Sequence, residues 1–384
     1  MSREEAQRIW QEASNLPFEC SANEQLLKVK YLERAVREAD RANWEEGSFD
    51  IRRELLHATT YPFTRIEVFP TLAWLLAKFD EQPDRRTGKE YWNYHGIVTT
   101  ETDLLSAYSQ VIEQAILQIP AVSLDQINQM LDDFTRRLQY HGYSLRAAML
   151  SRAWLYTELG KLDAAAQLVE EISFLERDDL AACEACERNE LVCFAAERND
   201  HAEAMKLAQP ILNGALSCES IPALTYTTLM LTALQENDLE LAKEMHLKGY
   251  PFIHDDHGLQ RVVVVAEHAI YLARVRDTSK GLDLIRKYLV HAMDNSSLGD
   301  RGYFFAGALA VTRLALETGA TTLAVRLPES HPVFNANSPD KCDLRELTQW
   351  LEREFQSGVA AFDARNGTKT HSSMLQEWMS LAKV

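Results

Sequence analysis

The sequence has 384 residues, which exceeds a usual single-core domain and indicates two domains or one elongated repeat body. Its formal net charge of −17 argues against binding to nucleic acid or an acidic membrane, because both are polyanions, and favours a basic or apolar protein partner. The first residues lack an apolar signal core, and no run reaches the roughly 18 apolar residues that span a bilayer. We therefore expect a cytoplasmic protein without a membrane segment.

Helical patterns cover residues 1–142, which we assign to an N-terminal region of degenerate repeats. Residues 32–59 predict a helix–turn–helix that is broken near Asn43 and Gly47. The stretch YWNYHG (91–96) predicts a helix that supplies aromatic side chains to a core, with an aromatic binding patch as the alternative. Further helices are predicted over 64–78, 101–117 and 123–142.

A repeat is clearest between residues 143 and 293. Pairs of small or apolar residues, twelve positions apart, recur in steps of 39, 38 and 39 residues. The pairs are Ala153 and Ala165, Val192 and Ala204, Met230 and Ala242, and Ala269 and Gly281. Each unit predicts two amphipathic helices, and because one pair cannot cover its own apolar face, neighbouring units must stack.

Short turns are predicted between the two helices of each unit. Glycine and asparagine tolerate the left-handed backbone that ends a helix, and a following aspartate can cap the next one. The predicted turns are Gly160-Lys161, Asn199-Asp200, Asn237-Asp238 and Asp277-Thr278.

This pattern resembles the tetratricopeptide repeat (TPR). The small residue late in the first helix corresponds to Ala153 and Ala269, the large residue three positions later to Tyr156 and Leu272, the turn glycine to Gly160, and the alanine of the second helix to Ala165, Ala204 and Ala242. The period of about 39 residues departs from the 34 of the family, and the closing proline is missing. The runs GYSLRA (142–147), DDLAACEAC (178–186) and FDARNGT (362–368) are similar to uncharacterised bacterial proteins built from such repeats, and this similarity implies no known activity.

The expected fold is all-α, a right-handed superhelical stack of helix pairs with degenerate terminal units. Downstream of the clear units, residues 301–326 predict one weaker unit. Residues 327–342 contain proline and asparagine without helical periodicity and predict a connector. We expect four parts: the N-terminal region 1–142, the TPR-like domain 143–326, the connector 327–342, and C-terminal capping helices over 343–384, with a helix over 343–365 that stops at Asn366-Gly367.

Three of the six cysteines allow three interpretations. A redox pair at Cys183 and Cys186 would need a strand leading into a helix, whereas the local periodicity is helical. A structural zinc site would use thiolates from adjacent loops. Free cysteines also commonly act as small packing residues between helices. The zinc hypothesis takes Cys183, Cys186, Cys218 and His246 as ligands, with His254 or His257 as substitutes for His246.

The sequence has no Gly-rich phosphate loop, no Gly-x-Ser-x-Gly elbow and no His-Glu-x-x-His motif, so we predict a non-enzymatic protein. The resemblance implies a scaffold that binds a protein or peptide on the concave surface lined by the first helices. The alternatives are a signal-peptide-sensing regulator of the bacterial TPR receptor type and, more remotely, a zinc-dependent hydrolase. The predicted groove positions are Trp154, Glu158, Asn189, Glu197, Thr227, Gln235 and Arg274.

Overall fold

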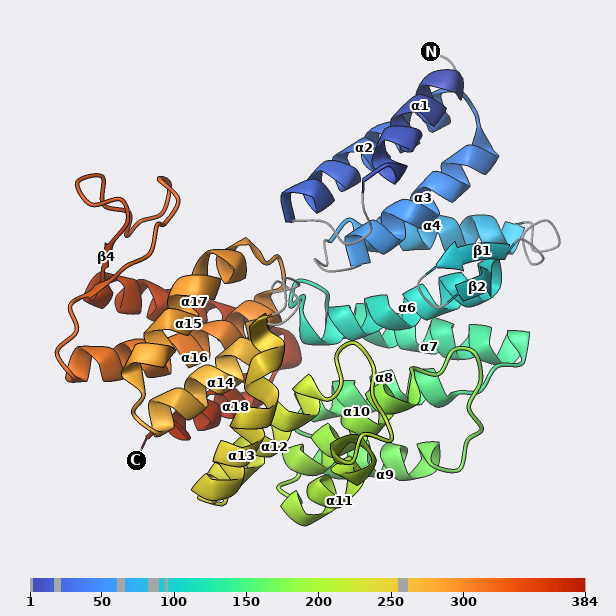
Figure 1. Cartoon of the computed structure of the whole chain (residues 1–384). Coiled ribbons are helices and arrows are strands. Elements are labelled where there is room, and N and C mark those ends of the chain that lie inside the picture. The colour runs from blue at the N-terminus through green and yellow to red at the C-terminus, as the bar shows by residue number, and fades with distance from the viewer. Residues whose placement is uncertain are drawn as a thin grey trace. The chain divides into compact units, whose positions relative to one another are not determined.

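The computed structural model describes residues 3–16, 22–60, 66–81, 90–93, 96–254 and 262–383. Nearly all of its regular structure is helical, and neighbouring helices pack in sequence order (Figure 1). The predicted all-α class is therefore confirmed. The chain divides into two compact units. Unit 1 comprises residues 1–115, 129–148 and 177–180, and unit 2 comprises residues 116–128, 149–176 and 181–384.

Unit 1 is built from helical hairpins and one short β-pair. A left-handed residue, Asn43, ends the second helix where a break was predicted, whereas Gly47 lies inside the third helix. The helices are α1 (Arg3–Ser14), α2 (Ala22–Arg41), α3 (Glu45–Thr60), α4 (Val68–Glu81) and most of α6 (Thr100–Leu117) and α7 (Leu124–His141).

The helix predicted over residues 91–96 is wrong. Strand β1 (Glu90–Asn93) pairs antiparallel with β2 (Gly96–Thr99), with Tyr91 opposite Val98 and Trp92 opposite Ile97. Aromatic and β-branched residues favour strands, and here that preference prevails over the helical pattern of the surrounding chain.

Unit 2 contains the repeat and the C-terminal helices. Its helices are α8 (Arg146–Glu158, from Met149 onward), α9 (Leu162–Ile172), α10 (Glu184–Glu197), α11 (His201–Leu212), α12 (Ala223–Gln235), α13 (Leu239–Gly249), the 3-10 turn η1 (Tyr250–His254), α14 (Val262–Arg274), α15 (Thr278–Asp294), α16 (Leu298–Glu317), α17 (Leu344–Asn366) and α18 (Thr370–Ser380). Helices α8 to α15 form four successive hairpins at the predicted places. All eight matched positions of the repeat are buried: Ala153, Ala165, Val192, Ala204, Met230, Ala242, Ala269 and Gly281.

The four hairpin turns share one backbone geometry. In every hairpin, the residue two positions before the second helix has a positive φ. These residues are Gly160 (71°), Asn199 (57°), Asn237 (58°) and Arg276 (59°). The next residue's N–H then donates to a carbonyl five positions back, as in Asp200 to Ala195 at 2.9 Å. The predicted fourth turn is therefore one residue late: Arg276 takes the left-handed position, and Asp277 instead caps α15 by accepting from the Lys280 N–H.

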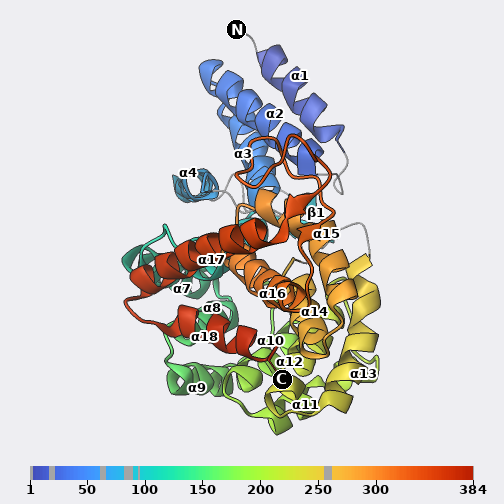
Figure 2. The same cartoon turned by 90° about the vertical axis from the view of Figure 1, so that its left-hand side faces the viewer.

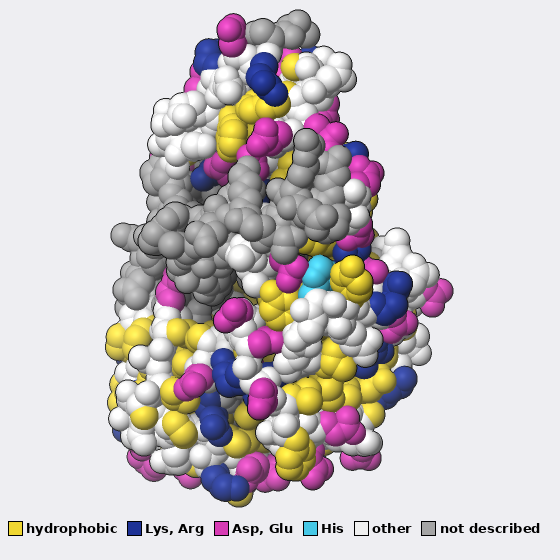
Figure 3. Space-filling model, turned by 90° about the vertical axis from the view of Figure 1, so that its right-hand side faces the viewer, with side chains coloured by type: hydrophobic (Ala, Val, Ile, Leu, Met, Phe, Trp, Pro, Cys, Tyr) yellow, Lys and Arg dark blue, Asp and Glu magenta, His cyan; other side chains and the backbone are white. Residues whose placement is uncertain are grey.

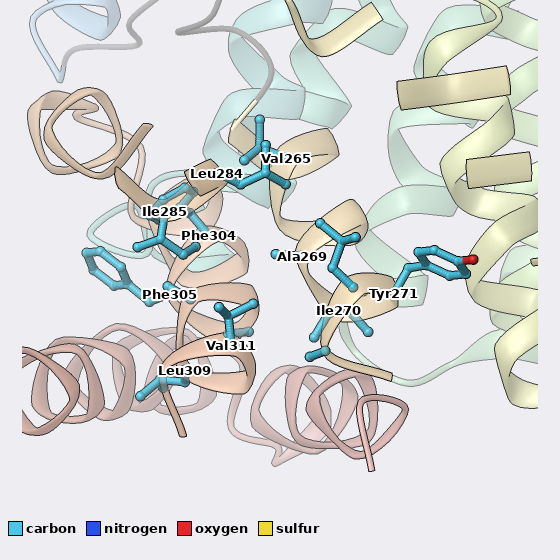
Figure 4. Close-up of a cluster of buried hydrophobic side chains, with 14 of the residues drawn as sticks. Val265, Ala269, Ile270, Tyr271, Leu284, Ile285, Phe304, Phe305, Leu309 and Val311 are labelled. Atoms are coloured by element: carbon cyan, nitrogen blue, oxygen red, sulfur yellow. The ribbon is translucent and has the colours of Figure 1, made fainter. Parts of the chain in front are cut away.

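A large part of the core of unit 2 lies where α14, α15 and α16 meet. Figure 4 shows Val265 and Ala269 of α14, Leu284 of α15 and Phe304 of α16 in this cluster, and all four are at most 2% exposed. Gly307 lets α16 approach α14 closely, because a Cβ there would lie 2.7 Å from the Ala266 carbonyl oxygen.

The C-terminal part departs from the helix-pair pattern. The region predicted as a weaker unit (301–326) holds one long helix, α16, followed by the short strand β3 (Thr322–Leu323), which pairs with β4 (Cys342–Asp343). Helix α17 ends at the left-handed Gly367 (φ 65°), as expected. Helix α18 then packs against α16 and α17 (Figure 2).

Candidate functional site

Three cysteine thiols of unit 2 come together at the start of α10. The sulfur atoms of Cys183, Cys186 and Cys218 lie within 4.8 Å of one another, and the Cys186 and Cys218 sulfurs are 3.5 Å apart. Cys183 is exposed and the other two are half-buried. The sequence therefore predicted correctly that these three residues gather, and their sulfur atoms are spaced closely enough to bind one metal ion.

The local chain holds the thiols in place. Cys183 is the N-cap of α10, and its sulfur accepts a hydrogen bond from the Cys186 N–H at 3.3 Å. The Cys218 N–H donates to the Ile221 carbonyl at 3.0 Å, which closes the loop before α12. The buried residues Ala185, Ile211 and Ile221 form a small apolar cluster, and Cys186 and Cys218 pack against it.

The thiols have different electrostatic surroundings. Partial burial acts to raise the pKa of Cys183, but hydrogen bonds from the Cys186 backbone and from the Cys186 and Cys218 thiols outweigh it, so its pKa is lowered. Burial and the neighbouring thiols raise the pKa of Cys186. A metal ion would displace the thiol protons that form these hydrogen bonds, because metals bind cysteine as thiolate.

The predicted fourth ligand, His246, is not brought to the thiols. It lies near the C-terminal end of α13, and its Nδ1 is 3.0 Å from Nδ1 of His268 in α14. Its ring stacks on Tyr271 at 4.2 Å between centroids. The prediction that His246 joins the thiols is therefore wrong, because α13 turns its ring toward α14 of the following hairpin. The substitute ligands His254 and His257 have side chains outside the described residues.

Two of the predicted groove residues are packed inside unit 2 instead. Asn189 is 7% exposed, and its Oδ1 accepts from the Thr225 hydroxyl at 2.7 Å. Thr227 is fully buried, and its hydroxyl donates to the Leu224 carbonyl. Asn189 is hydrogen-bonded to the neighbouring helix α12 and Thr227 to a carbonyl of its own helix, so neither presents an amide or hydroxyl to a ligand as we had predicted.

Two further predicted positions lie at helix ends or between helices. Trp154 packs its ring on Phe194 of α10, with centroids 4.5 Å apart. Gln235, the last residue of α12, is exposed. Gln235 is accessible to solvent, whereas Trp154 is half-buried.

Two of the remaining groove positions, Glu158 and Arg274, contact the chain's own C-terminal segment. The buried Glu158 carboxylate lies 3.2 Å from Nδ1 of His371 in α18. Arg274 at the end of α14 donates to the Lys383 carbonyl just after α18. Helix α18 thus runs from the end of α8 to the end of α14, along residues that the sequence had assigned to a ligand.

Glu197 is the one groove position that is both exposed and strongly perturbed. Surrounding protein, followed by repulsion from Glu158 and Glu377, raises the pKa of Glu197 to about 7. Its side chain nevertheless remains exposed to solvent.

Sequence reasoning assigned no functional role to three further residues with perturbed titration, Cys193, Glu267 and Tyr303. Cys193 lies on α10 four positions before Glu197, Glu267 lies on α14 and Tyr303 on α16. Burial raises the pKa of Glu267 to about 8, and the pKa of Tyr303 is raised by burial and by Glu158, Glu197, Glu267 and Asp300. No motif links these positions, because they lie on three different helices.

The surface carries mixed charge. On the face drawn in Figure 3, basic side chains lie scattered among acidic and hydrophobic ones. Across the part of the chain that the structure describes, none of the helices combines the length and apolarity needed to cross a bilayer.

Comparison with known proteins gives no family. No family model matches the chain, and no curated protein matches it in sequence.

Proposed function

We propose that this chain is a non-enzymatic, cytoplasmic scaffold that binds a protein segment or peptide on the inner surface of a right-handed, TPR-like superhelix. The observation that carries the proposal is the succession of four helix hairpins with identical left-handed turns. Hairpins that repeat one geometry stack with a constant small rotation, which curves the array and gives an extended inner surface.

The inner surface would be lined by the first helix of each hairpin, α8, α10, α12 and α14. Gln235 and Arg274, at the ends of α12 and α14, lie in corresponding places of successive hairpins and carry polar groups suited to a peptide backbone. Apolar contacts would supply much of the affinity.

A selection experiment tests the proposal. Random peptides displayed on phage are selected on the full-length chain, and the enriched peptides are synthesised and measured by calorimetry. We expect binding that Gln235→Ala and Arg274→Ala together weaken about tenfold, a loss of about 1.4 kcal/mol. The matched control changes Lys206 and Lys248 on the second helices to alanine and should leave affinity unchanged. Enrichment of no peptide, or equal losses in both double variants, would reject an inner binding surface.

We further propose that Cys183, Cys186 and Cys218 hold a structural zinc ion. Three thiolates fit zinc, and three sulfur ligands are typical of structural rather than catalytic sites. The ion would tie the loop before α12 to the start of α10 and so stiffen the junction between two hairpins. A fourth ligand would come from solvent or from residues outside the described part of the chain.

A further inference from the structure

Helix α18 contacts two residues that the sequence analysis assigned to a ligand. The His371 ring at its start lies 3.2 Å from the Glu158 carboxylate, and the Lys383 carbonyl just after its end accepts a hydrogen bond from Arg274. Glu158 ends α8 and Arg274 ends α14, so both belong to the first helices of repeat hairpins. A helix of the chain itself therefore holds positions where the proposed function expects a protein segment.

The side of α18 that faces unit 2 carries one imidazole and several apolar side chains. His371, Leu375 and Trp378 follow one another at spacings of four and three residues, which places them on one helix face. His371 and Leu375 are buried, and Met374, Trp378 and Met379 are partly buried and pack against the main core. The exposed positions of the same helix are polar: Ser373, Gln376, Glu377 and Ser380. This is the pattern by which an amphipathic helix enters a groove of another protein.

Helix α16 provides the apolar surface beneath α18. The Trp378 ring packs edge-to-face on Tyr303, with centroids 4.9 Å apart, and the Tyr303 hydroxyl lies 3.9 Å from the Met374 sulfur. A Cβ at Gly302 would lie 3.6 Å from Leu375, so Leu375 rests close to the backbone of α16. Two large side chains of α18 are thus seated on α16 as the anchors of a bound helix would be.

Few buried side chains hold α18 in place. Two of its eleven residues are buried, whereas eleven of the twenty-three residues of α17 are. The left-handed Gly367 ends α17 and separates the two helices. Elements with little buried apolar surface open at a smaller free energy than the core, so α18 can leave its place while α16 and α17 stay folded.

A segment that replaces α18 must satisfy the Glu158 carboxylate. This side chain is 7% exposed, and the His371 ring nitrogen lies against its Oε2. A buried carboxylate that loses its hydrogen-bond partner is strongly destabilised, so a ligand without a donor at this place would bind poorly. The donor belongs about one helical turn before the first apolar anchor, as His371 lies four residues before Leu375.

We infer that the surface formed by Glu158, Arg274, Gly302 and Tyr303, here called the α18 site, binds an amphipathic helix of a partner protein that takes the place of α18. The partner helix carries a hydrogen-bond donor for Glu158 in its first turn, followed by two large apolar residues spaced as in α18. This inference rests on the proposed peptide-binding function and names the form of its ligand. The apparent affinity for the partner scales with the fraction of molecules in which α18 has left the site.

Fluorescence anisotropy on the full-length chain tests this with three labelled peptides. The α18 peptide has the sequence of residues 368–383. The pattern helix is an alanine-rich helix of the same length that keeps only the equivalents of His371, Leu375 and Trp378. The blank helix has alanine at these three places as well.

The release variant, Leu375→Glu with Trp378→Glu, weakens the seat of α18 and leaves the α18 site unchanged. The matched control, Ser373→Glu with Gln376→Glu, adds the same charges at exposed positions of the same helix. Hydrogen–deuterium exchange verifies that the release variant exchanges faster over α18 alone. His371→Ala, with Ser373→Ala as its control, is a milder second release variant and decides the outcome if the first does not fold.

The pattern helix should bind the release variant about tenfold more tightly than the wild-type chain, and the matched control should bind like the wild type. Adding Glu158→Gln to the release variant should weaken this binding about tenfold. The blank helix should bind none of these proteins. Excess pattern helix should also speed up the exchange of residues 370–380 in the wild-type chain, because it displaces α18.

Equal affinities of the release variant and the wild type for the pattern helix would overturn the inference. Binding of the α18 peptide without binding of the pattern helix would also overturn it, since α18 would then be a structural element that only its own sequence can replace. Either result leaves intact the proposed function, which is tested separately by the peptides selected on phage.

Discussion

The Glu158 carboxylate and the His371 ring lie 3.2 Å apart, from Oε2 to Nδ1, although 213 residues separate them in the chain. Both side chains are buried, at 7% and 2% exposed. The Asn366 side-chain amide also donates to the Glu158 carbonyl at 3.3 Å. These contacts fix the start of α18 to the end of α8.

His371→Ala should loosen α18. The change leaves the buried Glu158 carboxylate without its partner and removes the ring that stacks on Phe362 at 4.2 Å, for an expected loss of about 1–3 kcal/mol. Hydrogen–deuterium exchange should speed up over residues 370–380, and the melting temperature should fall. Ser373→Ala, at an exposed position of the same helix, is the control. Unchanged exchange in α18 would show that Glu158 and His371 do not hold it.

The reduced chain should bind one zinc ion. Cobalt(II), which substitutes for zinc, should give a thiolate charge-transfer band, and Cys183→Ser, Cys186→Ser or Cys218→Ser should each weaken it. Cys342→Ser, at a buried cysteine outside the cluster, should leave the band unchanged. Chelation should lower the melting temperature, because a structural metal stabilises the fold. Less than a few tenths of a zinc per chain by elemental mass spectrometry would refute the site.

The pair His246 and His268 should make the protein sensitive to acid. Burial lowers the pKa of His246 to about 4, with Lys280 adding to the effect and Asp277 opposing it, and burial and His246 lower the pKa of His268 to about 3. The folded chain thus keeps both rings neutral while the unfolded chain takes up protons near the ordinary value of about 6.5. Their contribution to stability is complete above that pH and is lost progressively as the pH falls toward 4.

Urea unfolding at a series of pH values between 7 and 4.5 measures this loss. His268→Gln removes one titrating ring and should flatten the decrease in the free energy of unfolding over that range. A decrease as steep as in the wild-type chain would assign the acid sensitivity to other groups.

Glu267 should give a dependence of the opposite sign. Burial raises its folded pKa to about 8, while a hydrogen bond with the Thr227 side chain opposes the shift. The folded chain therefore holds a proton that the unfolded chain releases near 4.3, and stability from this group declines as the pH rises to about 8. Glu267→Gln keeps a neutral side chain of the same shape, so its free energy of unfolding should decline less between pH 5 and 8 than that of the wild type. Parallel curves would contradict the raised pKa.

Arg276→Gly should stabilise the fold. Arg276 holds φ at 59°, a conformation that costs a non-glycine residue about 1 kcal/mol. Glycine adopts it freely, so we expect a gain of up to about 1 kcal/mol in urea unfolding, reduced by the larger entropy of the unfolded chain. Ser279→Gly, in the first turn of α15, is the control and should destabilise the chain because its position is helical. A loss of stability in Arg276→Gly would mean that the arginine side chain has a role of its own.

Local patterns predicted most of the architecture. The matched pair at Ala153 and Ala165 recurs because each hairpin must bury a small residue where its two helices cross. The sequence of every hairpin therefore has small or apolar residues at these positions. The turn at Asn199 was predictable for the same reason, since few residue types tolerate its backbone angles. The exceptions were residues 91–96, where the local preference for strands prevailed, and Arg276, whose residue type does not indicate a left-handed turn.

The sequence by itself determined the all-helical class, the repeat period and the meeting of three cysteines, because each depends on residues close in the chain or in adjacent units. Only the tertiary structure decided that His246 turns toward His268, that Asn189 is packed inside, and that α18 lies against Glu158. Such contacts depend on the rotation of each helix about its axis and on the path of the chain beyond the repeat, and neither is encoded in a short pattern.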